Sequence, residues 1–312
     1  MNKKLLFFLA AIIFLFTISC SSAPKKSSEV NTRKNRAADY MEFGNRYFTQ
    51  GLYNQALVFF NMALDENIAA DFEPGISRVK SSIGRSYLLT GDLPKAEKYI
   101  VESYSLAKEL NDPDLIALSA NNAAELNIAK NIITEADKFI SEAITQAKSK
   151  SATQAEAYHT LAVIERKKGN SEKALATINK AIEINKDNKA HSNLAANYYF
   201  AASVYSQDNN YAKAVEMLNI ALKEDRIEEN SFGLAKDYKA LGIVSLKNNK
   251  KEEAYSFFIK SLDISRVIQN TDEEKSVLNY LIEISQDLGK TSDVKKFKDQ
   301  LGAIKDSTGA VQ

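Results

Sequence analysis

The chain has 312 residues, of which 45% are apolar, and 41 Lys and Arg stand against 40 Asp and Glu for a net charge of +1. A charge this close to zero argues against a nucleic-acid-binding or membrane-coating surface. The single cysteine excludes an internal disulfide, while the apolar content is sufficient for a continuous core.

The N-terminal segment has the composition of a secretory signal peptide. A basic start with Lys3 and Lys4 is followed by an apolar run over 5–18 and then by small polar residues. The run is too short to span a bilayer comfortably. We therefore expect residues 1–19 to be an export signal, with an uncleaved anchor as the alternative.

Cys20 directly follows this segment, where an isolated cysteine has little structural use. The site resembles the bacterial lipobox, in which the cysteine is diacylated and becomes the new N-terminus, although Thr17 stands where that motif usually has leucine. The resemblance implies lipidation at Cys20 and an exported protein anchored on the periplasmic side of a bacterial membrane. Ser21 is compatible with the outer membrane in bacteria that have two membranes, and surface display is also open. An ordinary secretory signal is the alternative.

Residues 20–36 are rich in serine and in basic residues, with Glu29 as the only acidic side chain. This composition is typical of a flexible, solvated linker. We expect a lipidated tether with a reach on the order of 20–25 Å.

Glycine or asparagine then recurs at a nearly fixed period along the rest of the chain. Spacings of 40, 40, 38, 40, 40 and 40 residues separate Gly51, Gly91, Asn131, Gly169, Asn209, Asn249 and Gly289. Both residue types tolerate a left-handed backbone, so a repeated helix–turn–helix is predicted. The interval of 38 predicts a shorter connection over 149–153.

Small residues recur in register with these turns and predict close helix crossings. Five residues after the turn stand Ala56, Ala96, Ala136, Ala174, Ala214, Ala254 and Val294, and seven before it stand Gly44, Gly84, Ala124, Ala162, Ala202, Gly242 and Ile282, so each column is small in six positions of seven. Large apolar residues follow the first column by four positions and share its helix face. Lys298 breaks this pattern in the last unit, which we expect to be a polar cap.

The repeat resembles the tetratricopeptide repeat. The segment YMEFGNRYFTQGLYNQALVFF over 40–60 carries Phe43, Gly44, Tyr47, Ala56 and Phe60 at the spacings of that family, although the unit exceeds 34 residues and lacks its Trp and closing Pro. The resemblance implies an all-α, right-handed superhelical solenoid of about seven helix–turn–helix repeats over 37–306, followed by a tail over 307–312. The repeats are expected to start near residues 37, 77, 117, 155, 195, 235 and 275.

No constellation of residues supports catalysis. His159 and His191 lie far apart in sequence, and neither has the spacing of a metal ligand. The many carboxylates alternate with lysines, as on solvated helix faces. We therefore expect a protein that is not an enzyme and that holds no metal or cofactor.

In the tetratricopeptide family the first helix of each pair lines the concave face. Applied to this register, the resemblance implies a peptide groove along Asn45, Ser81, Arg85, Asn121, Glu125, His159, Tyr199, Lys239, Asn279 and Glu283. Such side chains can bond the backbone of an extended peptide. The alternative is a wetted inner face with partners elsewhere. The lysines and asparagines with which some members of the family clamp a carboxylate are largely missing, since Met41, Ser82 and Leu118 take three of those places.

These observations favour a membrane-tethered scaffold that binds protein or peptide partners in the bacterial envelope. The alternative is a small-ligand-binding lipoprotein accessory to a transporter. An open polar groove would favour the scaffold, and deep apolar residues at one end of the superhelix would favour the ligand-binding protein.

Overall fold

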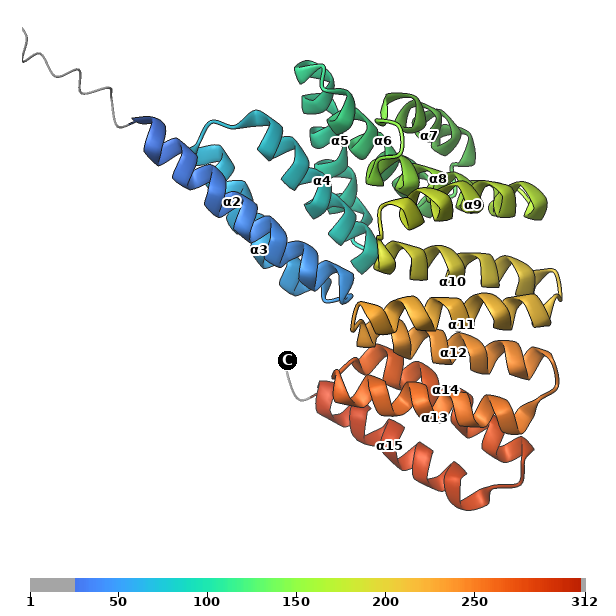
Figure 1. Cartoon of the computed structure of the whole chain (residues 1–312). Coiled ribbons are helices and arrows are strands. Elements are labelled where there is room, and N and C mark those ends of the chain that lie inside the picture. The colour runs from blue at the N-terminus through green and yellow to red at the C-terminus, as the bar shows by residue number, and fades with distance from the viewer. Residues whose placement is uncertain (1–25, 310–312) are drawn as a thin grey trace, which may run out of the picture.

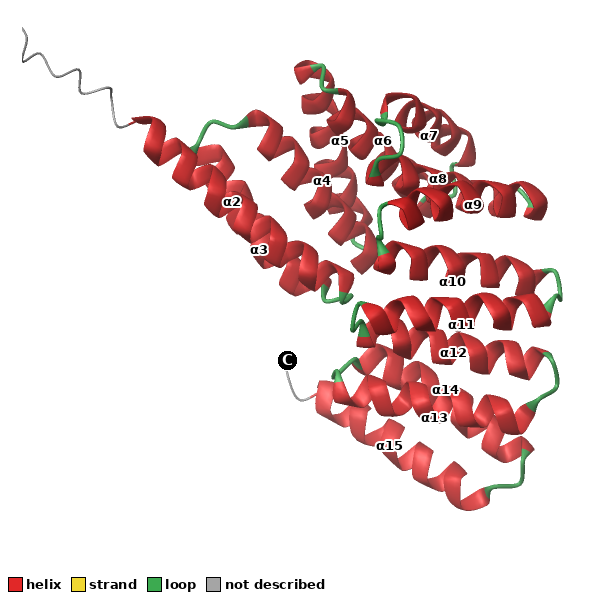
Figure 2. Ribbon diagram, viewed as in Figure 1, coloured by secondary structure: helices red, strands yellow, loops and turns green. Residues whose placement is uncertain are grey.

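The computed structural model describes residues 26–309, and within them every regular element is an α-helix. The helices are α2 (Lys26–Thr49), α3 (Tyr53–Ala69), α4 (Glu73–Thr90), α5 (Leu93–Leu110), α6 (Pro113–Ala129), α7 (Ile133–Gln146), α8 (Ala152–Lys167), α9 (Ser171–Asp187), α10 (His191–Gln207), α11 (Tyr211–Ile227), α12 (Ser231–Lys247), α13 (Lys251–Val267), α14 (Thr271–Asp287) and α15 (Thr291–Gly309). Each packs on the next in the chain, and short loops join them (Figure 2). The predicted all-α solenoid is confirmed, and its described part holds seven helix pairs.

The pairs follow one another along an arc that turns back on itself (Figure 1). The end of the first pair comes close to α11 and α12, which are the ninth and tenth helices after α2. Gly51, in the turn between α2 and α3, lies against the ring of Phe232 at the start of α12, and a Cβ atom at Gly51 would collide with that ring. The solenoid is therefore closed by a contact between the first and the sixth pair.

The predicted turn residues all adopt the left-handed backbone conformation. Their φ angles are 72° at Gly51, 84° at Gly91, 60° at Asn131, 82° at Gly169, 59° at Asn209, 57° at Asn249 and 67° at Gly289. At Gly91 the amide bonds the carbonyl of Leu88 at 3.2 Å, and the amide of Asp92 bonds that of Tyr87 at 3.0 Å. This is the Schellman motif, which satisfies the free carbonyls at the end of a helix.

The turns between pairs use the same motif with residues that the sequence pattern did not single out. Asp71, Asn111, Lys189, Glu229 and Gln269 have φ angles of 50–56°, and each is followed by a residue whose amide bonds back to the helix. Left-handed geometry is uncommon for lysine, glutamate and glutamine. Packing of successive pairs therefore imposes this turn even where the residue does not favour it.

The interval of 38 residues has a different origin from the one expected. The connection over 147–151 is longer than the three-residue connections over 188–190 and 228–230, so the prediction of a shorter connection near 149–153 is wrong. Instead α7 has 14 residues, whereas α9 and α11 have 17. Helix α7 ends early because Ala147 is extended, with ψ of 134°, rather than helical.

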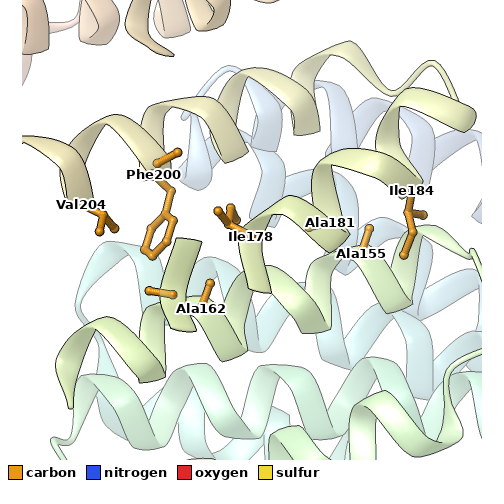
Figure 3. Packing of buried hydrophobic residues seen from close by; sticks show 9 residues of the cluster. Ala155, Ala162, Ile178, Ala181, Ile184, Phe200 and Val204 are labelled. Atoms are coloured by element: carbon orange, nitrogen blue, oxygen red, sulfur yellow. The ribbon is translucent and has the colours of Figure 1, made fainter. Parts of the chain in front are cut away.

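The small-residue columns mark the helix crossings, as predicted. Ala56, Ala96, Ala136, Ala174, Ala214 and Ala254 are all completely buried. At Gly84 an added Cβ would lie 2.6 Å from Cγ1 of Ile100, so the two helices of that pair meet at glycine. Figure 3 shows the equivalent packing in the fourth and fifth pairs, where Ala162, Ile178 and Phe200 come together. Burial of such apolar side chains is the main stabilising term of the fold.

The two ends of the solenoid differ from expectation. Helix α2 begins at Lys26, so the flexible tether expected over 20–36 does not extend past the start of that helix. Arg33 and Arg36 are held on the helix because both pair with Glu66 of α3, at 3.3 and 2.9 Å.

In the last pair Phe297, only 1% exposed, takes the core position that the register had assigned to Lys298, which is exposed. The register therefore slips by one residue in α15, and the last pair buries an aromatic ring instead of ending in the polar core position expected of a cap. The repeats begin at the starts of α4, α6, α8, α10, α12 and α14, three or four residues before the predicted positions.

Candidate functional site

A chamber of ≈ 1030 Å³ lies on the inner side of the arc. Its walls are mainly the first helices of the first six pairs, namely α2, α4, α6, α8, α10 and α12, and it includes Phe232 at the closing contact. Most of the lining side chains are polar or charged. The curvature of the solenoid thus gathers side chains from six different pairs around one cavity.

An ion-pair cluster ties the first four pairs together at the chamber wall. Nε of Arg85 on α4 lies 3.2 Å from Oε2 of Glu125 on α6, and Nη1 lies 3.8 Å from Oε1 of Glu156 on α8. The guanidinium also stands over the ring of Phe48 on α2, 5.4 Å from its centre. Glu125 raises the pKa of Arg85 further, whereas burial raises the pKa of Glu156 although Arg85 opposes this. Arg85 therefore stays charged and is neutralised within the wall.

A second cluster joins α8 and α10. Nδ1 of His159 lies 2.7 Å from Oδ1 of Asn197, and the His159 ring contacts Phe200 with centroids 5.3 Å apart. Burial lowers the pKa of His159, so the neutral imidazole donates its Nδ1 proton to the amide oxygen at neutral pH. Cζ of Arg166 lies 4.9 Å from the centre of the Phe200 ring, and its Nη1 donates to Oγ of Ser203 at 2.6 Å.

A pair of buried carboxyl groups lies between α11 and α12. Asp225 and Asp237 are 3% and 2% exposed. Burial raises the pKa of Asp237 to about 9 and that of Asp225 to about 6, and Asp225 adds to the effect on Asp237. Two close carboxylates cannot both ionise easily, so the pair holds one proton at neutral pH. Asn230 donates to Oδ1 of Asp225 at 2.9 Å, which favours the ionised form of that group.

The predicted groove is only partly gathered. Six of its ten residues line the chamber, and these are Asn45, Arg85, Glu125, His159, Tyr199 and Lys239. Ser81 and Asn121 are instead buried between helices, where Ser81 Oγ accepts a bond of 2.7 Å from Asn122. Asn279 and Glu283 are exposed on α14, outside the chamber lining. The predicted groove residues therefore form one site only from α2 to α12, and those on α14 lie outside it.

Asn197 and Asp237 line the chamber but lie outside the stripe that the repeat register predicts. Asn197 and Asp237 occupy the position five residues before the small column, where Val79, Ala157 and Val277 stand in other pairs. All five are buried. The same column also holds Asp39, which is exposed, and Ser119, so a polar residue there indicates a site only where it is also buried, which the sequence does not show.

The lipidation site predicted at Cys20 and the export signal over 1–19 lie outside the described residues. Among the helices that the structure does describe, none combines the length and apolar character needed to cross a bilayer.

Comparison with known proteins supports the fold. The profile of the tetratricopeptide repeat family matches residues 153–223, and no curated protein sequence matches the chain. A Rap protein in complex with competence and sporulation factor is 15% identical, with 89% of this chain and 77% of that chain covered at a TM-score of 0.64. The type IV pilus biogenesis factor PilW is 16% identical, with 73% and 93% covered at 0.55. BtubC from P. vanneervenii is 18% identical, with 71% and 91% covered at 0.54.

These identities establish a shared fold and nothing about a shared ligand. Residues 153–223 thus match the tetratricopeptide repeat by sequence, and the described solenoid as a whole shares the fold of the tetratricopeptide-like structures it resembles.

Proposed function

We propose that this protein is a non-catalytic scaffold, anchored through a lipid on Cys20 to a bacterial envelope membrane, whose chamber binds a peptide segment of a protein partner. The observation that carries the proposal is the chamber lining. Amide side chains at Asn45 and Asn193 offer both donors and acceptors to an extended backbone, and Tyr199 offers apolar area.

The lining combines apolar surface with many charged and amide groups, and these groups favour a peptide over an apolar small molecule. Small-molecule pockets are lined mainly by hydrophobic and aromatic side chains with few polar groups. Here charged and amide groups from α4, α6, α8, α10 and α12 surround the cavity. A peptide in the chamber would bury backbone N–H and C=O groups that need hydrogen-bond partners, and these side chains can supply them along its length.

Photo-crosslinking in cells tests the binding site. A photoreactive amino acid replaces Tyr199, which lines the chamber, or Val101 on α5, which is 53% exposed and lies outside the lining. We expect a protein-sized adduct at position 199 and none at 101. Adducts at 101 alone would place the partner on the outer face, and a small-molecule adduct at 199 would favour the transporter-accessory alternative.

Membrane fractionation tests the anchor separately. The variant Cys20→Ser should move to the soluble fraction, whereas Ser22→Ala, which keeps the cysteine, should stay with membranes. A Cys20→Ser protein that still sediments with membranes would contradict lipidation and favour an uncleaved apolar anchor.

A further inference from the structure

The outer face of the first pair carries an exposed apolar patch. Val58 and Met62 lie one turn apart on the same face of α3, where they are 59% and 38% exposed, and Phe43 of α2 is 43% exposed. Phe59 connects the two helices, because its ring centre lies 5.5 Å from that of Phe43 and it follows Val58 in the chain. These four residues form one continuous surface, which we call the first-pair patch.

The register shows that the α3 part of this patch is particular to the first pair. In the next five pairs, the positions of Val58 and Met62 hold mostly charged or small residues. They are Lys98, Lys138, Ala176, Glu216 and Ser256 for the first position, and Glu102, Glu142, Lys180, Ile220 and Lys260 for the second. Among them only Ile220 is large and apolar, and it packs beside a core cluster. Exposed apolar side chains at both positions therefore distinguish α3 from its equivalents.

Phe43 is exposed because of its place at the end of the solenoid. At the equivalent position Ile83, Leu241 and Leu281 are completely buried, whereas no pair packs on the outer side of α2 among residues 26–309. Figure 1 shows α2 and α3 at one end of the arc. The residues of the first-pair patch do not contribute to the chamber lining, so this surface is separate from the proposed peptide site.

The first pair is also the part of the solenoid that follows the proposed anchor most closely. Five residues, 21–25, separate Cys20 from the start of α2 at Lys26, and even a fully extended chain of that length spans at most about 20 Å. Phe43 lies about 25 Å further along α2, at the rise of an α-helix. A lipid on Cys20 therefore keeps the bilayer within reach of the patch, which touches it when α2 and α3 lie along the membrane surface.

We propose that the first-pair patch docks on the lipid bilayer, with α2 and α3 lying along its surface. This inference rests on the lipid anchor of the proposed function. Exposed charged residues border the patch, since Asp39 and Arg46 flank Phe43 by one turn on either side and Asp65 follows Met62 by one turn. Apolar side chains at the acyl boundary with charged neighbours among the headgroups are the arrangement of an interfacial helix. These neighbours are more acidic than basic, so the contact suits zwitterionic lipid.

Tryptophan fluorescence tests the docking, because the chain has no tryptophan of its own. Full-length, lipidated Met62→Trp protein is reconstituted in phosphatidylcholine vesicles with or without bromine on the acyl chains, which quenches tryptophan in the hydrocarbon region. We expect brominated lipid to lower the emission at least about twofold, because an interfacial apolar face reaches the acyl boundary. Lys180→Trp changes an exposed side chain at the equivalent position of α9, and its emission should be the same in both lipids.

A charge placed in the patch separates docking from the affinity of the added tryptophan for membranes. Val58→Glu in the Met62→Trp background should restore the emission in brominated vesicles, because a carboxylate resists transfer into an apolar medium. Val101→Glu, at a side chain on α5 that is 53% exposed, is the matched control and should leave the quenching intact. Circular dichroism checks that each variant folds. If Met62→Trp does not, Val58→Trp combined with Met62→Glu gives the same test.

Flotation of the vesicles in a density gradient reports on the anchor independently. Protein that floats with the vesicles but shows equal emission of Met62→Trp in both lipids would overturn the docking and leave the anchor in place. Equal quenching of Met62→Trp and Lys180→Trp, or quenching that survives Val58→Glu, would overturn it as well. Protein that does not float would overturn the lipid anchor and, with it, the docking.

Discussion

The part of the chamber wall formed by α10 and α12 differs from the last pair, α14 and α15, in what it buries at the same position of the repeat. At one equivalent position the wall carries Asn197 and Asp237, while the last pair carries Val277. All three side chains are almost completely buried. In the last pair the apolar residue joins a cluster with Leu281 and Phe297.

This difference shows that a buried position of the solenoid can either contribute stability or hold a polar group at a cost in stability. The wall gives up apolar contact at these positions and keeps polar groups with unmade hydrogen bonds, which costs about 1–3 kcal/mol for each such group. The last pair places apolar groups there and gains stability. Since each pair contacts mainly its neighbours, the two regions are expected to respond separately to substitution.

The largest expected effect is in the last pair. Phe297→Ala removes a completely buried ring and should lower the free energy of unfolding by about 3–5 kcal/mol. Because α15 packs mainly on α14 among the described helices, the loss should appear as early unfolding of that pair, with the chamber still formed. Hydrogen exchange measured along the chain would resolve the two regions. Phe43→Ala, at a side chain that is 43% exposed, should cost much less; uniform loss of protection along the chain would contradict separate behaviour.

The next effect concerns the carboxyl pair in the wall. Both pKa values are raised, to about 6 for Asp225 and about 9 for Asp237, so the folded protein holds protons that the unfolded chain has already released. The contribution of the pair is therefore full below about pH 4 and declines as the pH rises towards 9. Lys236 weakens this effect at Asp225, and Glu228 strengthens it.

Asp237→Asn removes the ionisable group while keeping its size and polarity. We expect a gain on the order of 2 kcal/mol in the free energy of unfolding at pH 8, with little change at pH 4. Urea denaturation at both values measures it, and Asp263→Asn, at an exposed carboxyl on α13, is the matched control. An equal gain at pH 4 and pH 8 would mean that the carboxyl pair is not the cause.

A smaller effect tests the contact that closes the chamber. Gly51 and Gly91 both have left-handed φ angles, so alanine at either should cost about 1–2 kcal/mol. Only at Gly51 does the added Cβ collide with Phe232, because nothing lies within 4 Å of the one at Gly91. Gly51→Ala should therefore be the less stable variant, and X-ray scattering should show a larger radius of gyration. Identical scattering from the two variants would contradict closure by this contact.

Much of the fold could be predicted because the turns and helix crossings of each repeat require particular residue types at fixed positions. A left-handed turn within each pair favours Gly or Asn, and a close helix crossing favours Ala or Gly. Gly91 therefore predicts the turn, and Ala96 predicts the buried crossing. The turns between pairs could not be found in this way. Lys189 and Glu229 adopt the same backbone because neighbouring pairs impose it, and that cause lies outside the residues themselves.

The site was predicted less well because it depends on how far the arc turns. The register placed Arg85, His159 and Tyr199 on the inner face, and they do line the chamber. It also placed Asn279 there, although the closing contact at Phe232 leaves the last pair outside the chamber. Curvature accumulates from small rotations between pairs, which no single column of residues specifies.

The smallest expected effect is at these excluded positions and tests whether the chamber, rather than the stripe, is the site. The double variant Asn279→Ala and Glu283→Ala should change the free energy of unfolding by less than about 0.5 kcal/mol, because both side chains are exposed. It should also leave the crosslinking at position 199 unchanged, since α14 does not contribute to the lining. If the crosslink weakened as the stability stayed constant, the partner would have to extend past the closing contact along α14. The stripe predicted from the register would then be the binding surface, and the chamber only its first part.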